Sequence, residues 1–192
     1  MPRRDLRRFP VFVAVLALGV ALNASGQAPR GKPQPPSHKA SASLSLEDRD
    51  FANKAAAGGI ATVEMGKLAQ QISKTAEVKK LAERIVAERG KANEELKALS
   101  AAKANPLPVS PSRVAMIEME KVVKLTGAKF DEEYLEHTCA DQKKDIKEFE
   151  KQSKSGKDPD LTKWAGEKLP TLQEHLRLAE AALAKAKGAR KK

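Results

Sequence analysis

Four polar residues stand where helical spacing would otherwise place apolar side chains. They are Glu64, Arg89, Gln142 and His175, each in a different apolar segment of the chain. Glu and His side chains that face one another inside a helical bundle are ligands for iron or manganese. Glu64 and His175 are therefore the candidate ligands for a divalent metal.

The same residues allow two other interpretations. Arg89 carries a permanent positive charge that repels a divalent cation, and Gln142 is a weak metal ligand. The four residues would then form a polar network in the core, in which Glu64 pairs with Arg89 while Gln142 and His175 hydrogen-bond around them. Alternatively, Glu64 and Arg89 pack their stems at the edge of the core and keep their charged ends in water, while His175 is a hydrogen-bonded histidine at the interface and Gln142 is a tolerated polar position. Neither interpretation needs a metal or another cofactor, so we expect none.

The common catalytic patterns are missing from the sequence. It contains no Gly-rich phosphate loop, no CxxC pair, no HExxH motif and no Ser flanked by the glycines of a nucleophile elbow. The only cysteine, Cys139, is expected to be a small buried hydrophobe. His137 lies off the apolar face, so we expect it to be exposed. These features predict a protein that is not an enzyme.

Helices must position these residues, because apolar residues recur at spacings of three or four in each segment. Ser45 and Asp48 form a capping box for the first helix, and Thr75 caps the second. The pair Gly58-Gly59 indicates close approach of two helices. Pro170 is expected to kink or break the last helix. The predicted helices span residues 46–73, 76–103, 110–127, 130–156 and 158–183.

The composition and the links between helices predict the fold class. Aromatic residues make up only 4% of the 192 residues, and helix-forming residues dominate, which argues against a β-sandwich or a Rossmann-type sheet. Short links join the first two long helices and the last two, so each pair forms an antiparallel hairpin. We therefore predict an all-α fold: an antiparallel ferritin-like four-helix bundle, with an extra short helix on the crossover between its two halves.

The first 26 residues are typical of a signal peptide. Four arginines precede an apolar run over residues 11–22, and small or polar residues follow it. The run has about 12 residues, whereas a membrane-spanning helix needs about 20, so cleavage is favoured over retention as an anchor. We expect a periplasmic or secreted mature protein without a transmembrane span.

The rest of the chain divides by composition into three parts. Residues 27–45 are rich in Pro, Ser and Lys and are predicted to be a disordered spacer. Residues 46–184 form the helical bundle domain, and residues 185–192 form a basic tail.

The positive charge lies mostly outside the bundle. The whole chain has a formal net charge of +11, but residues 46–184 contain 24 basic and 24 acidic residues. Attraction to anions is therefore assigned to the ends of the chain. The predicted contacts with an anionic surface are Lys185, Lys187, Arg190, Lys191 and Lys192.

Several stretches together resemble an exported bacterial family, domain of unknown function 4142. They are Asp50-Phe51, residues 55–59, 64–69 and 92–96, Phe130-Asp131 with Tyr134, and Leu169-Pro170 with Leu172 and His175. The resemblance implies a ferritin-like fold in a protein of the outer membrane or periplasm. Members of the family usually carry Asp-His in the second long helix and His in the third. This chain has Glu88-Arg89 and Gln142 there, whereas Glu64 and His175 match.

The first functional hypothesis is a non-enzymatic interaction module of the cell envelope, whose partner is an anionic envelope component or a protein. The alternative is a ferritin-like metal-binding or redox protein with a degenerate site at Glu64 and His175. Nucleic-acid binding is not expected, because the chain is predicted to be exported and has few aromatic residues for base stacking.

Overall fold

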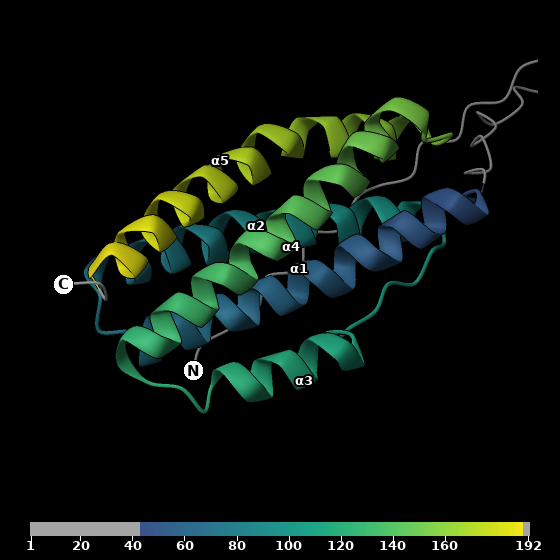
Figure 1. Cartoon of the computed structure of the whole chain (residues 1–192). Helices are drawn as coiled ribbons and strands as arrows, with labels where there is room; N and C mark the ends of the chain where they lie inside the picture. The colour runs from purple at the N-terminus through teal and green to yellow at the C-terminus, as the bar shows by residue number, and fades with distance from the viewer. Residues whose placement is uncertain (1–42, 190–192) are drawn as a thin grey trace, which may run out of the picture. The chain divides into compact units, whose positions relative to one another are not determined.

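The computed structural model describes residues 43–189, and over this range the chain is all-helical (Figure 1). This confirms the predicted all-α class. The predicted signal peptide, most of the predicted spacer and the last three residues lie outside the described residues. The helices are α1 (Leu46–Ile72), α2 (Ala76–Ala102), α3 (Arg113–Val122), α4 (Gly127–Ser155) and α5 (Pro159–Ala189).

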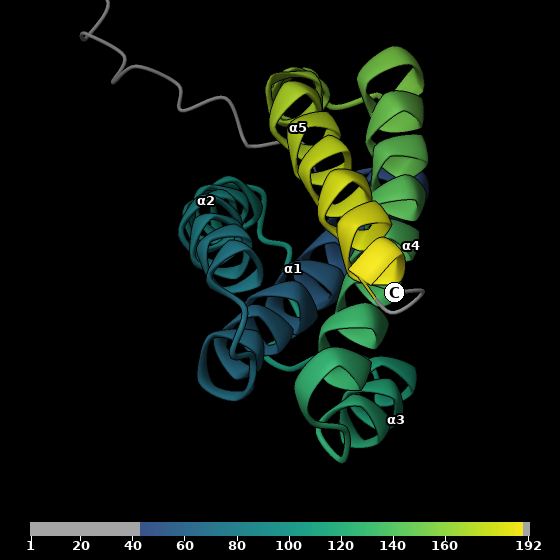
Figure 2. The same cartoon turned by 60° about the vertical axis from the view of Figure 1, so that its left-hand side comes forward.

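The four long helices pack as two hairpins. Helix α1 packs along α2, and α4 packs along α5. The hairpins meet where α1 contacts α4 and where α2 contacts α5. Helix α3 lies on the connection between the hairpins and contacts α1 and α4 from outside, as Figure 2 shows.

Two apolar clusters make up the core. The first surrounds Phe130 and Leu135, both fully buried, and includes Met65, Ile85 and Ala179. The second surrounds an aromatic group of Phe51, Phe149 and Trp164, whose ring centroids lie 5.1 to 6.3 Å apart. Burial of these side chains is the main contribution to the stability of the bundle.

Asp48 ties the start of α1 to the link between α4 and α5. Ser45 accepts a hydrogen bond from the Asp48 backbone N–H, which confirms the predicted N-terminal cap. The Asp48 carboxylate accepts hydrogen bonds from Gln152 Nε2 at 2.7 Å and from the backbone N–H groups of Lys157 and Asp158. Asp48 is only 1% exposed. This residue of the first helical turn therefore also makes a buried contact with the α4–α5 link.

One predicted cap contact and one predicted helix start are wrong. Thr75 makes no side-chain cap to α2, because its hydroxyl donates instead to the carboxylate of Asp131. The cap of α3 is Ser112, which accepts from the Ala115 N–H, so the helix begins two residues later than Ser110-Pro111 predicts.

The predicted helix stop at Gly127 is also wrong, and of the kink or break predicted at Pro170 the break does not occur. Gly127, predicted to end a helix, begins α4 with a φ of 59°, a conformation that glycine adopts without steric cost. Helix α5 continues through Pro170. Proline removes only its own hydrogen bond to the preceding turn, and the buried Leu172 beside it keeps the helix packed.

Glycines in α1 allow α2 to approach closely, as the Gly58-Gly59 pair indicates. A Cβ atom at Gly59 would overlap the side-chain amide of Asn93. A Cβ atom at Gly66 would lie 2.7 Å from Val86 Cγ2 and 3.3 Å from the Ala82 carbonyl oxygen. Because Val86 is β-branched and restricted in a helix, it cannot turn away easily.

We expect Gly66→Ala to lower the free energy of unfolding by about 1–3 kcal/mol, because the added methyl group overpacks the α1–α2 contact. Gly90→Ala is the matched control, since Gly90 lies inside α2 with open space around its Cβ position. This control should raise the free energy of unfolding by about 0.5–1 kcal/mol. Urea unfolding followed by circular dichroism measures both, and an equal gain from both would contradict the close packing.

Candidate functional site

A layer of polar side chains separates the two apolar clusters. Arg89, Gln142 and His175 are 3%, 1% and 0% exposed, as predicted for residues on inward faces. Each lies between a residue of the first cluster and one of the second along its own helix. With Asp145 they form what we call the polar layer.

Asp145 neutralises the buried charge of Arg89. Arg89 Nη2 donates to Asp145 Oδ2 at 2.5 Å, and the guanidinium carbon lies 5.8 Å from the centre of the Phe149 ring. Burial raises the pKa of Asp145, and the positive charge of Arg89 opposes that rise. The pair connects α2 to α4.

Glu88 is the partner of His175. His175 Nε2 lies 2.7 Å from Glu88 Oε2, and Arg84 Nε donates to Glu88 Oε1 at 3.0 Å. Burial lowers the pKa of His175, although the hydrogen bond to Glu88 opposes this. The neutral ring therefore donates its Nε2–H to the carboxylate, which joins α5 to α2.

Glu64 does not belong to the polar layer, and its predicted pairing with Arg89 is wrong. Glu64 is exposed on α1, whereas the adjacent Met65 is 3% exposed and packs in the first cluster. The inward line of α1 thus runs through Met65 and places Glu64 one position off it. Glu64 and His175 do not form the predicted ligand pair, because the Nε2 atom of His175 is hydrogen-bonded to Glu88.

Sequence reasoning missed both carboxylates that the polar layer uses. Asp145 lies three residues after Gln142, on the same helical face, so its spacing was an available signal. Glu88 directly precedes Arg89 and lies at the edge of the inward face, where its side chain is 36% exposed. It lies three residues after Ile85 and four before Ala92, so its spacing along α2 was an available signal too.

The polar layer does not fit the metal that a ferritin-like fold implies. Over residues 43–189 no group of three or more His, Cys, Asp or Glu side chains is placed to hold a metal ion. The Arg89 guanidinium at the centre would repel a divalent cation. Within the same range, Arg89 Nε, Gln142 Oε1 and His175 Nδ1 have no hydrogen-bond partner.

Cys139 and His137 lie near the polar layer on α4. Cys139 is a free, buried thiol whose pKa is raised by burial, as expected for a small buried hydrophobe. His137 is less exposed than predicted, with 17% of its side chain accessible. Its Nδ1 lies 3.1 Å from Asp141 Oδ2, and its Nε2 lies 3.1 Å from Glu118 Oε2 of α3. The hydrogen bond to Asp141 raises the pKa of His137, burial opposes it, and Glu118 raises it further.

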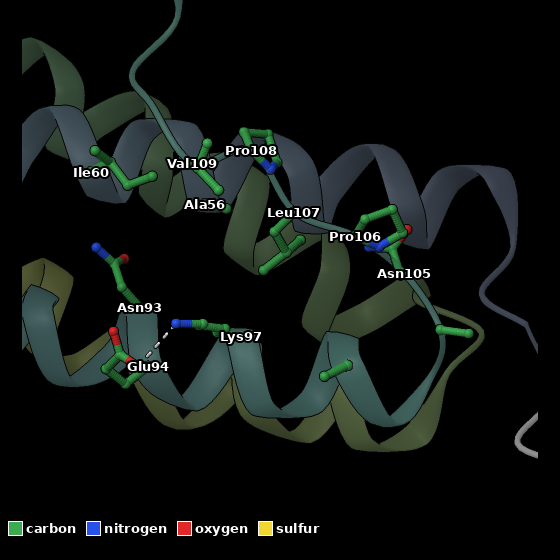
Figure 3. A pocket seen from close by; sticks show the side chains of 12 residues that line it. Ala56, Ile60, Asn93, Glu94, Lys97, Asn105, Pro106, Leu107, Pro108 and Val109 are labelled. Carbon is green, nitrogen blue, oxygen red and sulfur yellow. Dashed lines mark ion pairs between the residues drawn. The ribbon is translucent and has the colours of Figure 1, made fainter.

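A second candidate site is an apolar groove of about 640 Å³ between α1, α2 and the segment that follows α2. Figure 3 shows Ala56 and Ile60 on α1, Asn93, Glu94 and Lys97 on α2, and residues 105–109 crossing between the two helices. Asn105 lines the groove, is 5% exposed, and has no partner for its Nδ2 atom among the described residues. Sequence reasoning missed this groove, because residues 105–108 were interpreted only as the end of a helix.

Comparison with known proteins assigns the family. The model for "Domain of unknown function (DUF4142)" matches residues 33–182. The chain belongs to the DUF4142 family. This confirms the resemblance found in the sequence. No curated protein matches the DUF4142 chain.

Two solved structures resemble the DUF4142 chain in fold. One is named "putative secreted protein DUF305" from Streptomyces coelicolor, with a TM-score of 0.63, 18% identity, and coverage of 73% of this chain and 93% of that one. The other is a DUF305 fragment from Deinococcus radiodurans, with a TM-score of 0.66, 14% identity, and coverage of 74% and 99%. At these identities the likeness extends to the fold alone. Among the described helices of the DUF4142 chain, none has the length and apolar character to cross a membrane.

We expect Asp145→Leu to lower the free energy of unfolding by about 3–5 kcal/mol, because it leaves the Arg89 charge buried and unpaired. The double variant Arg89→Met/Asp145→Leu removes both charges and should recover most of that loss. Asp50→Asn is the control, since Asp50 forms an exposed pair with Lys54 and its loss should have little effect. Urea unfolding measures all three, and a double variant no more stable than Asp145→Leu would contradict the pairing.

We expect the attachment of α3 to weaken as the pH rises above about 6.5, the ordinary pKa of histidine. A neutral imidazole has one N–H, so only the protonated ring of His137 donates to both Glu118 and Asp141. Because folding raises this pKa, the contribution is complete at low pH and is lost as the pH rises through the folded pKa. Hydrogen exchange of α3 amides at pH 6 and 8, corrected for intrinsic rates, measures this. His137→Gln should remove the difference, and equal protection of wild-type α3 at both pH values would contradict it.

Proposed function

We propose that this DUF4142 protein is an exported, non-enzymatic interaction module of the cell envelope. It would act in the periplasm or outside the cell after cleavage of residues 1–26 and would be linked through the spacer at residues 27–45. The signal-like N-terminus supports export, and the name of one structural neighbour describes that neighbour as secreted. The ion pairs of the polar layer support a non-catalytic role, since they occupy the groups that could otherwise act on a substrate.

The observation that carries the proposal is the surface of the crossover between the hairpins. Among the described residues, five of the six exposed large apolar side chains lie between residues 109 and 123. Concentrated exposed apolar side chains are typical of contact surfaces. We call these residues the crossover face: Val109, Val114, Met116, Ile117 and Val123.

The basic C-terminus is the second part of the proposed contact, toward an anionic envelope component. Helix α5 continues to Ala189, past the predicted domain boundary at residue 184. Lys185 Nζ lies 2.7 Å from Glu77 Oε1, and Lys187 Nζ lies 2.5 Å from Glu136 Oε1. These two lysines are therefore partly neutralised by the bundle, and we assign the anionic contact mainly to Arg190, Lys191 and Lys192, which follow α5 in the sequence.

We further propose that the four long helices form a ferritin-like bundle. Two hairpins joined by a long crossover are the connectivity of ferritin-like folds. The alternative function, metal binding or redox chemistry at Glu64 and His175, has less support. Glu64 is exposed and His175 is paired with Glu88, so a metal there would need both side chains to move.

We expect removal of residues 190–192 to weaken binding to anionic vesicles by about tenfold or more, because each basic residue near such a surface contributes about 1 kcal/mol. The mature chain from residue 27 would be sedimented with phosphatidylglycerol vesicles and with neutral phosphatidylcholine vesicles. Added salt should weaken binding to the anionic vesicles only.

Two variants make this test specific. Replacement of the exposed Lys67, Lys151 and Lys154 by Gln removes the same charge elsewhere and should change binding much less. Removal of residues 185–192 also deletes the ion pairs to Glu77 and Glu136, so it should lower the melting temperature, unlike removal of residues 190–192. Equal binding of the full chain and the chain ending at residue 189 would exclude a role for the C-terminus.

A further inference from the structure

Helix α3 has an outward face that combines apolar and basic side chains. Residues at spacings of three or four along α3 and the turn that follows it share this side of the helix. We call them the basic face: Arg113, Val114, Ile117, Lys121 and Lys124. All five are exposed, Val114 by 65% and Ile117 by 44%. The two apolar side chains thus lie between an arginine at the start of the helix and two lysines at its end.

The positive charges of the basic face are not neutralised by the bundle. Within residues 43–189, no ion pair involves Arg113, Lys121 or Lys124. Long basic side chains can pack their stems against apolar neighbours while their charged ends reach an anionic group. The basic face can therefore contact an anion and an apolar surface at the same time.

The two acidic residues of α3 lie off the basic face. Glu118 is directed toward α4, where its Oε2 lies 3.1 Å from His137 Nε2. Glu120 is exposed but follows Met116 by four residues, which places it on the adjacent side of the helix. Because the basic face carries only positive charge, two copies of it would repel each other. Its charge therefore favours an anionic partner over self-association.

Helix α3 is held on the outside of the bundle, where an extended surface can reach it. Val122 is the only buried residue of α3, and Figure 2 shows the helix outside the four long ones. Helices α3 and α5 run toward the same end of the bundle in Figure 1, and Val122 shares the first apolar cluster with Ala182 of α5. Lys121 and Lys124 thus lie at the end of the bundle where α5 also ends.

An anionic lipid surface offers both kinds of contact that the basic face can make. Helices with apolar and basic side chains bind in the plane of a membrane interface, and their affinity depends on the inserted apolar area and on attraction to anionic lipids. A helix that docks in a protein groove instead presents a continuous apolar line at spacings of three, four and seven. On the basic face, Ile117 is followed at these spacings by Lys121 and Lys124, so the apolar line is interrupted.

We propose that the basic face of α3 binds the surface of an anionic lipid membrane. Val114 and Ile117 insert at the boundary between headgroups and acyl chains. The three basic side chains contact lipid phosphates. This proposal rests on the proposed function, an envelope interaction module, and names the partner of the crossover face to which Val114 and Ile117 belong.

Sedimentation of the mature chain with phosphatidylglycerol vesicles tests both parts of the contact. We expect Val114→Gln/Ile117→Gln to weaken binding by about tenfold or more, because it removes the inserted apolar area. Arg113→Gln/Lys121→Gln/Lys124→Gln should also weaken it by about tenfold or more. Glutamine is a good helix former, so both variants should keep the wild-type melting temperature.

Matched controls separate the basic face from the rest of the surface. Leu46→Gln replaces the exposed large apolar residue of α1 and should bind like the wild type. The triple replacement of Lys67, Lys151 and Lys154 by Gln removes the same charge as the basic variant and should change binding much less.

Fluorescence quenching measures insertion directly. Val114→Trp should be quenched by phosphatidylglycerol that carries bromine on its acyl chains, whereas Leu46→Trp should not. Trp164 is 6% exposed and gives the same background in both variants. Equal quenching of the two variants, or quenching of neither, would overturn the proposal.

The binding results distinguish this proposal from the one for the C-terminus, because each set of variants leaves the other contact intact. If the α3 variants bind weakly while the chain ending at residue 189 binds like the full chain, the basic face is supported and the C-terminal contact fails. Vesicle binding that the α3 variants do not weaken, or no vesicle binding at all, overturns the membrane contact and leaves the crossover face to a protein partner.

Discussion

The burial of the Arg89 charge constrains the rest of this bundle. A guanidinium that is 3% exposed needs a carboxylate within hydrogen-bonding distance, and Asp145 provides it from α4. Helix α2 packs along α1 and α5, and α4 packs along the same two helices, so this pair reaches across the bundle rather than along a neighbouring contact. The relative position of the two hairpins is thereby restricted at mid-length, and the apolar core divides into the two clusters on either side.

The charged and titratable groups in the middle of the bundle are paired with one another. Arg89 is paired with Asp145 and His175 with Glu88, so the groups best suited to bind a ligand or move a proton bind one another. Asp48 has a similar function at one end of the bundle, where it holds the link between α4 and α5. The exposed apolar side chains, by contrast, are concentrated on the crossover: among the described residues, five of the six large ones lie between residues 109 and 123.

Much of the fold could be predicted from the sequence, because helices with one buried face have a regular apolar spacing. The long helices α1 and α2 end within one residue of their predicted limits, and Arg89, Gln142 and His175 are buried as predicted. The candidate site was predicted less well. Glu64 lies one position off the inward line of α1, a difference of about 100° around a helix that spacing alone did not resolve. Thr75 donates to Asp131 instead of capping its own helix, Gly127 begins a helix that it was predicted to end, and α5 continues through Pro170.

The sequence by itself determined the all-helical class, the family, and the polar residues that interrupt the inward faces, since these depend on composition and local periodicity. Only the tertiary structure decided which carboxylates pair with Arg89 and His175, because those partners lie on other helices or at the edge of a face. The groove at Asn105 likewise depends on how residues 104–109 cross α1 and α2. A cavity exists only between elements that are distant in sequence, so no local pattern in the chain records it.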